Sequence, residues 1–184
     1  MAVEQSKQKH GSVPAHTYYA ASHGHWRGRM HATVSSTSAV IRSMGLFNAL
    51  SVLAMSYLPS WLGKIYLETT VDYEPGAPVR HTTTVFCWGL AMMKSEEYVH
   101  ILDNGVEFTI VGESRFSMMP WRRVPMEGRG QIDPTARHAT YALSWLGTTL
   151  EQTTDRQNDH VILRQSAPGF TAIQHLKRTL GKGD

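Results

Sequence analysis

The densest group of titratable side chains in this 184-residue chain lies near its middle. It comprises Glu96, Glu97, His100, Glu113 and Arg115. A carboxyl group buried among apolar side chains has a raised pKa and can transfer protons near neutral pH, as cyclases, isomerases and dehydratases require. We therefore predict Glu97, His100, Glu113 and Arg115 as candidate catalytic residues. Ion pairing between neighbouring strands on an outer face is the alternative for the whole group.

Aromatic and methionine side chains are frequent around the same region and can line a pocket. The chain has nine methionines, whose flexible and polarizable side chains suit an adaptable apolar cavity. Ordinary core packing is the alternative for each residue taken singly. We predict a pocket for a hydrophobic or aromatic small molecule, lined by Trp88, Met92, Met93, Tyr98, Phe108, Met118, Met119, Trp121, Tyr141 and Trp145.

Histidines and the single cysteine offer other chemistry. His23, His25 and His31 share one face of an expected strand, and two histidines separated by one residue can ligate zinc. No third ligand lies close by in the sequence, so we predict no metal site. Cys87 stands in an apolar run, which predicts a buried and unreactive thiol. A lone cysteine excludes an internal disulfide and favours a reducing compartment, so we expect the cytoplasm.

Strands must position these side chains, because the region from 78 to 116 alternates with a period of two. Both alternating faces mix polar and apolar residues. Asn104-Gly105 separates two alternating runs, and this dipeptide is typical of a tight hairpin turn. The stretch therefore predicts a meander, which is a common part of up-and-down barrels.

The same alternation recurs along most of the chain. Trp121–Asp133 is rich in Arg, Gly and Pro, and we expect a loop followed by a short strand there. The complete pattern predicts a mainly β protein, an antiparallel up-and-down barrel of about 8–10 strands. Further strands are expected at 23–36, 61–73, 138–153, 159–166 and 171–180.

A helical pattern interrupts the strands at residues 37–60. Val40, Met44, Phe47 and Leu50 recur at three- or four-residue spacing, and Pro59 blocks further continuation. Thr37 or Ser38 is the expected N-cap. We predict a helical insertion that acts as a lid over the core or a pocket mouth. A membrane span is the competing interpretation, but polar residues interrupt the run and it falls short of about 20 apolar residues.

The composition and charge of the chain limit which kinds of partner we expect. The net charge of +3 is spread over 18 basic and 15 acidic residues, so no concentrated patch suits a phosphate backbone and we expect no nucleic-acid partner. We also expect no membrane partner, and a homodimer is compatible with the sequence. The polar N-terminus predicts a disordered leader at residues 1–20, followed by a single barrel domain at 21–184.

A short motif, Gly24-His25-Trp26-Arg27-Gly28, resembles the G-x-W start of the first strand in the calycin superfamily, which includes lipocalins and fatty-acid-binding-like barrels. The resemblance implies that Trp26 closes one barrel end and that an arginine from near the C-terminus lies across it. Arg178 is the candidate. Such stacking is favourable because a guanidinium gains from the ring face and from burial of its stem.

The middle of the chain is similar to the nitrobindin-like branch of this superfamily. The resemblance rests on Glu68 to Pro78, a strand with Trp88, a strand with glutamates and the Asp-Asn-Gly turn. His175 falls where that branch carries its haem-binding histidine, so the resemblance implies haem as a candidate cofactor; the residues themselves predict none. A surface histidine is the alternative for His175.

These observations predict binding of one hydrophobic or aromatic small molecule inside the barrel. A second hypothesis is an enzyme of the same architecture, a non-redox cyclase, isomerase or dehydratase that uses glutamate and histidine. Haem binding through His175 is a third. A structural or protein-interaction module would be favoured if the barrel were filled and had no cavity.

Overall fold

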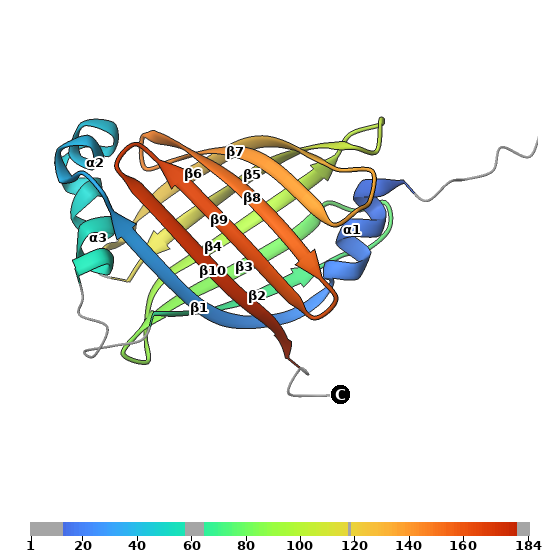
Figure 1. Cartoon of the computed structure of the whole chain (residues 1–184), viewed down its shortest axis with the longest axis horizontal. Helices are drawn as coiled ribbons and strands as arrows, with labels where there is room; N and C mark the ends of the chain where they lie inside the picture. The colour runs from blue at the N-terminus through green and yellow to red at the C-terminus, as the bar shows by residue number, and fades with distance from the viewer. Residues whose placement is uncertain (1–12, 58–64, 118, 180–184) are drawn as a thin grey trace, which may run out of the picture.

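Ten strands close into an antiparallel up-and-down barrel in the computed structural model, which describes residues 13–57, 65–117 and 119–179. Each strand pairs with its neighbours in sequence, and β1 (Gly24–Val34) closes the barrel against β10 (Phe170–Thr179) (Figure 1). The predicted fold class is confirmed. The other strands are β2 (Tyr66–Asp72), β3 (Val79–Cys87), β4 (Leu90–Ile101), β5 (Glu107–Phe116), β6 (Met119–Ile132), β7 (His138–Trp145), β8 (Thr148–Gln157) and β9 (His160–Ala167).

The barrel interior is built from alternate residues of each strand, because successive side chains leave a strand on opposite faces. In β8, Thr148, Leu150, Gln152 and Thr154 are buried, and the residues between them are mostly exposed. The strands β7 and β10 show the same alternation. The core therefore lies inside the barrel, and it includes polar side chains as well as apolar ones.

The Asn104-Gly105 turn is confirmed between β4 and β5. Gly105 has φ of +64°, a conformation that glycine adopts without strain. The side-chain oxygen of Asn104 accepts hydrogen bonds from the backbone N–H groups of Val106 and Glu107, at 3.1 and 2.9 Å. These bonds set the register of β4 against β5.

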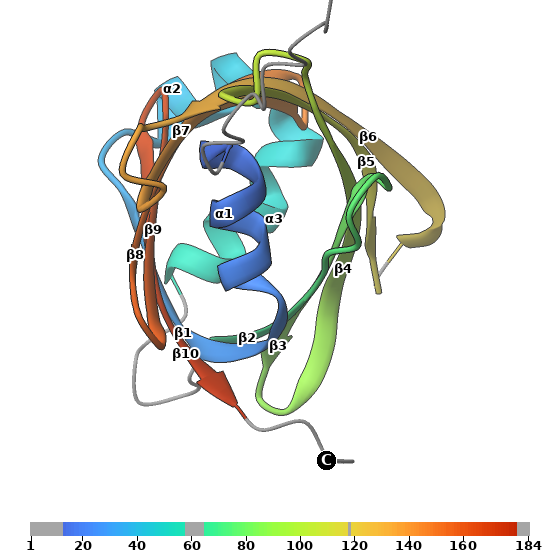
Figure 2. The same cartoon turned by 90° about the vertical axis from the view of Figure 1, so that its right-hand side faces the viewer.

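A helix, α1 (Pro14–Ser22), lies across one end of the barrel (Figures 1 and 2). It buries Ala15, Tyr18 and Tyr19, and the backbone N–H of Ala15 donates to the carbonyl of Gly105 at 3.0 Å. The predicted leader extended to residue 20, so its boundary was wrong over the helical residues. Burial of the two tyrosines stabilises this segment although its neighbours in sequence are polar. Residues 1–12 lie outside the described part.

The inserted segment forms two helices, α2 (Thr37–Met44) and α3 (Leu46–Tyr57), at the opposite end of the barrel (Figure 1). The N-cap is Ser36, one residue before the expected position, and its hydroxyl accepts from the N–H of Ala39. The side-chain amide of Asn48 anchors α3 to the carbonyl of Leu146 at 3.0 Å. Residues 58–60 of the predicted lid are outside the described residues. No described helix is long and apolar enough to cross a membrane.

Two predicted strand boundaries were wrong. The expected loop after Trp121 belongs to β6, a strand of 14 residues in which the buried Val124 and Met126 alternate with exposed residues such as Arg123. The single strand expected at 138–153 is the hairpin of β7 and β8. Leu146 and Gly147 both have positive φ there, which produces a two-residue turn that the Leu side chain gave no reason to expect.

Candidate functional site

A cavity of about 180 Å³ lies inside the barrel. All ten strands and α1 contribute side chains to its wall, whereas α2 and α3 contribute none among the described residues. The wall is mainly apolar, with residues such as Leu67, Met93, Ile110 and Leu143. A smaller set of polar side chains points into the same space. This combination is typical of a small-molecule site, in which apolar walls provide affinity and a few polar groups provide orientation.

Glu97 is the only carboxyl group among the described residues that line the cavity, and no lysine or arginine lines it. Burial raises the pKa of Glu97 to about 7, because the apolar wall penalises the ionised form; a hydrogen bond from the Ser95 hydroxyl opposes this effect. Gly112 is paired with Glu97 on β5, where an added Cβ would lie 3.1 Å from the Glu97 Cγ. The tightest contacts of that Cβ would be with backbone, 2.4 Å from the Glu96 carbonyl oxygen and 2.9 Å from the Glu97 Cα, so the absence of a side chain there permits the close approach of β4 and β5.

His81 stands directly opposite Glu97 in the pairing of β3 with β4, and both side chains line the cavity. The Nε2 atom of His81 is buried and has no hydrogen-bond partner among the described residues. Burial lowers the pKa of His81 to about 4, although the charge of Asp72 opposes this shift. The imidazole is therefore neutral at physiological pH, and its ring meets Tyr19 edge-on at 5.7 Å between centroids.

Aromatic rings surround this polar pair at the α1 end of the cavity. Tyr19 contacts Phe108 edge-on at 5.9 Å, and Phe108 contacts Tyr141 at the same distance. Burial raises the pKa of Tyr18 to about 12 and raises the pKa values of Tyr19 and Tyr141 as well, with the charge of Glu97 contributing to both of the latter. The three hydroxyls therefore stay protonated and can donate or accept hydrogen bonds.

Three glutamines from neighbouring strands form a chain on the cavity wall. The amide nitrogen of Gln174 donates to the carbonyl of Gln165, and the amide nitrogen of Gln165 donates to the carbonyl of Gln152, both at 3.1 Å. The sulfur of Met30 lies 4.0 Å from the Gln174 nitrogen. These contacts hold the amides in place, so they present fixed polar groups to the cavity.

The structure brings five of the sequence-predicted site residues together around the cavity. They share inward positions on β4, β5 and β7, and Trp145 is fixed by a 2.9 Å hydrogen bond from its indole nitrogen to the Ser114 hydroxyl. Their contact with a ligand, and the catalytic role of the glutamate, stay predictions. The five are Met93, Glu97, Phe108, Tyr141 and Trp145.

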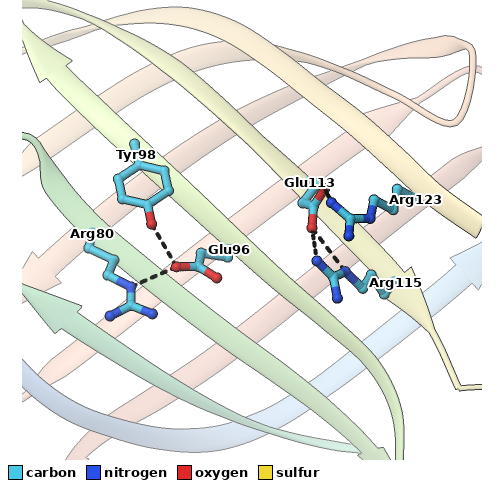
Figure 3. A network of polar contacts seen from close by, with 6 residues as sticks. All are labelled: Arg80, Glu96, Tyr98, Glu113, Arg115 and Arg123. Carbon is cyan, nitrogen blue, oxygen red and sulfur yellow. Dashed lines mark hydrogen bonds and ion pairs between the residues drawn. The ribbon is translucent and has the colours of Figure 1, made fainter. Parts of the chain in front are cut away.

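Glu113 and Arg115 do not face the interior, so the prediction that they act inside the barrel was wrong. Figure 3 shows them on the outer surface, where Arg115 Nε donates to Glu113 at 2.9 Å and Arg123 lies 3.5 Å from the other carboxylate oxygen. Glu96 forms a second outer cluster with Arg80 and Tyr98, each at 2.8 Å. The Arg115 hydrogen bond lowers the pKa of Glu113. The alternative of ion pairing between strands therefore describes Arg80 with Glu96 and Arg123 with Glu113, whereas Arg115 and Glu113 both belong to β5.

The remaining predicted site residues also lie outside the cavity wall. His100 is exposed on the same outer face of β4 as Tyr98, because Ser95, Glu97 and Val99 take the inward positions. Trp88 occupies the β3–β4 turn with 55% of its surface exposed, Trp121 is 79% exposed, and neither lines the cavity. The prediction of pocket lining was therefore wrong for Trp88, Met92, Tyr98, Met119 and Trp121, and His100 is not placed to act inside the barrel as predicted. Met118 is outside the described residues.

The cavity wall includes neither Cys87 nor any of the histidines that were considered for haem or zinc binding. His175 is exposed and does not line the cavity, so it is not placed to ligate a haem held there. His25 bonds to the Thr70 hydroxyl at 3.0 Å, and His23 accepts from the backbone of Tyr73. No three potential metal ligands gather anywhere in the described residues. Cys87 is buried, as expected, and burial raises the pKa of its thiol.

Sequence reasoning missed several residues of the cavity. His81 lies in a run of threonines where either face could point inward, and Tyr18 and Tyr19 lie in a segment assigned to the leader. The signal for α1 was Pro14, since proline favours the first helical position. The glutamine chain could have been found from the alternation of β8, β9 and β10. Each of these strands has a glutamine at a position that alternation assigns to the same face as apolar residues of the strand. The missed glutamines, which are hydrogen-bonded to one another on the cavity wall, are Gln152, Gln165 and Gln174.

Comparisons with known proteins bear on the fold. No protein-family model and no curated protein matches the chain. Among solved structures, Rv2717c from M. tuberculosis is similar with a TM-score of 0.56 and 12% identity, over 91% of this chain and 98% of that one. A secretory abundant heat soluble protein from Ramazzottius varieornatus has a TM-score of 0.49 and 12% identity, over 86% and 96% of the two chains.

Fatty-acid-binding protein 1 of Echinococcus granulosus is similar at a TM-score of 0.45 and 6% identity, over 88% of this chain and 99% of that one. The likeness to Rv2717c covers nearly the whole of both chains and shows the fold alone. Membership of the nitrobindin-like branch stays a prediction. With the closed ten-stranded topology and the G-x-W strand, the chain has a calycin-like β-barrel fold.

Proposed function

We propose that this protein binds one compact, mainly apolar small molecule inside the barrel. The observation that carries the proposal is the cavity of about 180 Å³, lined by apolar side chains with polar groups converging from several strands. Natural pockets for small molecules have this composition. A filled barrel, expected for a purely structural module, would lack such a space.

The size of the cavity limits the ligand. A dry apolar cavity of about 150 Å³ holds benzene, and pockets for drug-sized ligands run to about 300–1,000 Å³. The present cavity of about 180 Å³ therefore suits a body of one ring or a short branched chain. Haem, with four pyrrole rings, exceeds this space, and His175 lies outside it.

Calorimetric titration with benzyl alcohol tests the proposal. The parent protein should bind one equivalent, whereas Thr83→Phe, which places a ring in the cavity, should not bind. Thr84→Phe is the matched control, because Thr84 follows on the same strand and is absent from the cavity wall. Equal binding by the two variants would show that the alcohol does not enter the barrel. Native mass spectrometry of the freshly purified protein would reveal any molecule retained from the cell.

A second candidate function is acid–base catalysis on such a ligand. The supporting observation is Glu97, whose pKa of about 7 suits proton transfer, opposite a neutral His81 in the same cavity. Turnover of a bound molecule separates an enzyme from a binding protein, and saturation binding does not. For an enzyme, Glu97→Gln should lower turnover by roughly 10²–10⁴-fold, the usual contribution of a positioned proton-transfer group.

A further inference from the structure

We propose that the ligand of this cavity carries a protonated amine, which pairs with the Glu97 carboxylate, while its apolar body fills the rest of the barrel. This inference rests on the proposed function, since it names the chemical class of the molecule bound. It follows from the charges, the aromatic rings and the hydrogen-bonding groups that face Glu97.

The charge of the cavity wall favours a cation. Glu97 is the only side chain of the described wall that is ionised at mildly alkaline pH, and no lysine or arginine of the described residues lines the cavity to neutralise it. Arg156 packs 5.6 Å from the Tyr18 ring but is not part of the wall. A buried carboxylate without a counter-charge is costly, so a ligand that brings a positive charge supplies the pairing that the described wall lacks. An anionic ligand would meet no counter-charge and would be repelled.

Aromatic rings surround the position that an ammonium group would take. Tyr19 and Tyr141 lie within electrostatic range of Glu97, and Phe108 touches both of their rings. A cation close to a ring face is attracted by the negative centre of the ring, and this attraction grows when water is excluded. The tyrosine hydroxyls are protonated and can accept further ammonium N–H bonds. The surroundings of Glu97 thus match an ammonium group better than a neutral one.

The side chains facing Glu97 also define how binding depends on pH. They are Tyr19 from α1, His81 from β3, Ser95 from β4 and Tyr141 from β7, and the paired position on β5 is Gly112; Tyr18 packs behind Tyr19 on the same wall. The tyrosines and His81 stay neutral from about pH 5 to 9, so Glu97 alone changes charge in that interval. Amine binding should therefore strengthen as pH rises through the pKa of Glu97, until the amine itself loses its proton.

Three one-ring probes of nearly equal size test the inference by calorimetry: benzylamine, benzyl alcohol and benzoate. At pH 8 benzylamine should bind more tightly than benzyl alcohol, and benzoate should be the weakest. Benzylamine affinity should fall between pH 8 and pH 6, while benzyl alcohol affinity should change little. Glu97→Gln should weaken benzylamine roughly ten- to a hundredfold, the scale of a lost charge-assisted hydrogen bond, and should abolish its pH dependence.

Glu113→Gln is the matched control, because it removes a carboxyl group from the outer face and should leave all three affinities unchanged. Benzoate binding as tightly as benzylamine, or a Glu97→Gln variant that binds benzylamine like the parent, would overturn the amine assignment. If benzyl alcohol still binds and Thr83→Phe blocks it, the proposed cavity function survives that failure. If none of the three probes binds to the folded parent, both proposals are wrong.

Discussion

The guanidinium of Arg178 lies over the ring of Trp26, 4.8 Å from its centroid, and the two residues face each other across the β1–β10 seam that closes the barrel. The indole nitrogen of Trp26 donates to the carbonyl of Ser22 at 2.8 Å, and Arg178 donates to the carbonyl of Ala21. This pair therefore joins the closing seam to the end of α1. The stacking of Arg178 on Trp26 that the calycin resemblance implied is confirmed.

Trp26→Ala should lower the free energy of unfolding by about 3–5 kcal/mol, because the ring is 3% exposed and its removal leaves a cavity. Urea unfolding measures the loss. Trp121→Ala is the control, since that ring is 79% exposed and its removal should change stability by less than about 0.5 kcal/mol. A loss below about 1 kcal/mol for Trp26→Ala would mean that the ring does not close the barrel end.

Gly28→Ala should destabilise the barrel by about 3 kcal/mol or more, as backbone must move to admit the added methyl group. An alanine Cβ at this position would lie 1.8 Å from the carbonyl oxygen of His175, which belongs to the β1–β10 ladder and cannot rotate away. Thermal unfolding followed by circular dichroism measures the effect. An alanine variant as stable as the parent would contradict the close approach of these strands.

Glu97→Gln should make the protein more stable at pH 8 by up to about 3 kcal/mol and leave it nearly unchanged at pH 4. Burial raises the pKa of Glu97 from 4.5 to about 7, so folding favours the protonated carboxyl. The stability that the protonated Glu97 carboxyl contributes is fully present below pH 4.5 and is lost as pH rises through 7. Urea unfolding of both proteins along a pH series gives the difference. If the free energies of unfolding of the two proteins changed with pH in parallel, the Glu97 carboxyl group would be solvated in the folded state.

His81→Phe should protect the protein against acid. Burial lowers the pKa of His81 from 6.5 to about 4, so the folded state resists protonation of this ring. The corresponding stability is present above pH 6.5 and is lost as pH falls through 4. Phenylalanine keeps the ring contact with Tyr19 and removes an unpaired buried nitrogen. The acid-unfolding midpoint of the variant should shift to lower pH; a midpoint equal to that of the parent would contradict the assignment.

The helices at the two ends of the barrel, α1 at one end and α2 with α3 at the other (Figure 1), should contribute differently to ligand binding. Phe47 and Leu50, expected from the sequence to close the pocket, are 61% and 54% exposed and do not line the cavity. Phe47→Asp and Leu50→Asp should therefore bind benzyl alcohol as the parent does. Tyr19→Ala should release it faster, because this ring forms part of the cavity wall at the α1 end. Stopped-flow displacement measures the rates, and faster release from the Asp variants alone would make α2 and α3 the entrance.

The amino-acid sequence by itself determined the elements of this protein. A period of two marked most of the strands, Asn104-Gly105 marked a hairpin, and the helical spacing of residues 37–57 marked the inserted helices. These features are local, because they depend on the direction of neighbouring side chains and on the φ values that single residues tolerate. The G-x-W motif added the closing strand and its arginine.

Only the tertiary structure decided which face of each strand points inward. Glu96 and Glu97 are adjacent in sequence, but one forms an outer ion pair and the other lines the cavity, since a shift of one residue exchanges the two faces of a strand. Both faces of β4 mix polar and apolar side chains, so composition did not distinguish them. The burial of Tyr19 against His81, and the chain of three glutamines, depend on residues far apart in sequence that meet only when the barrel closes.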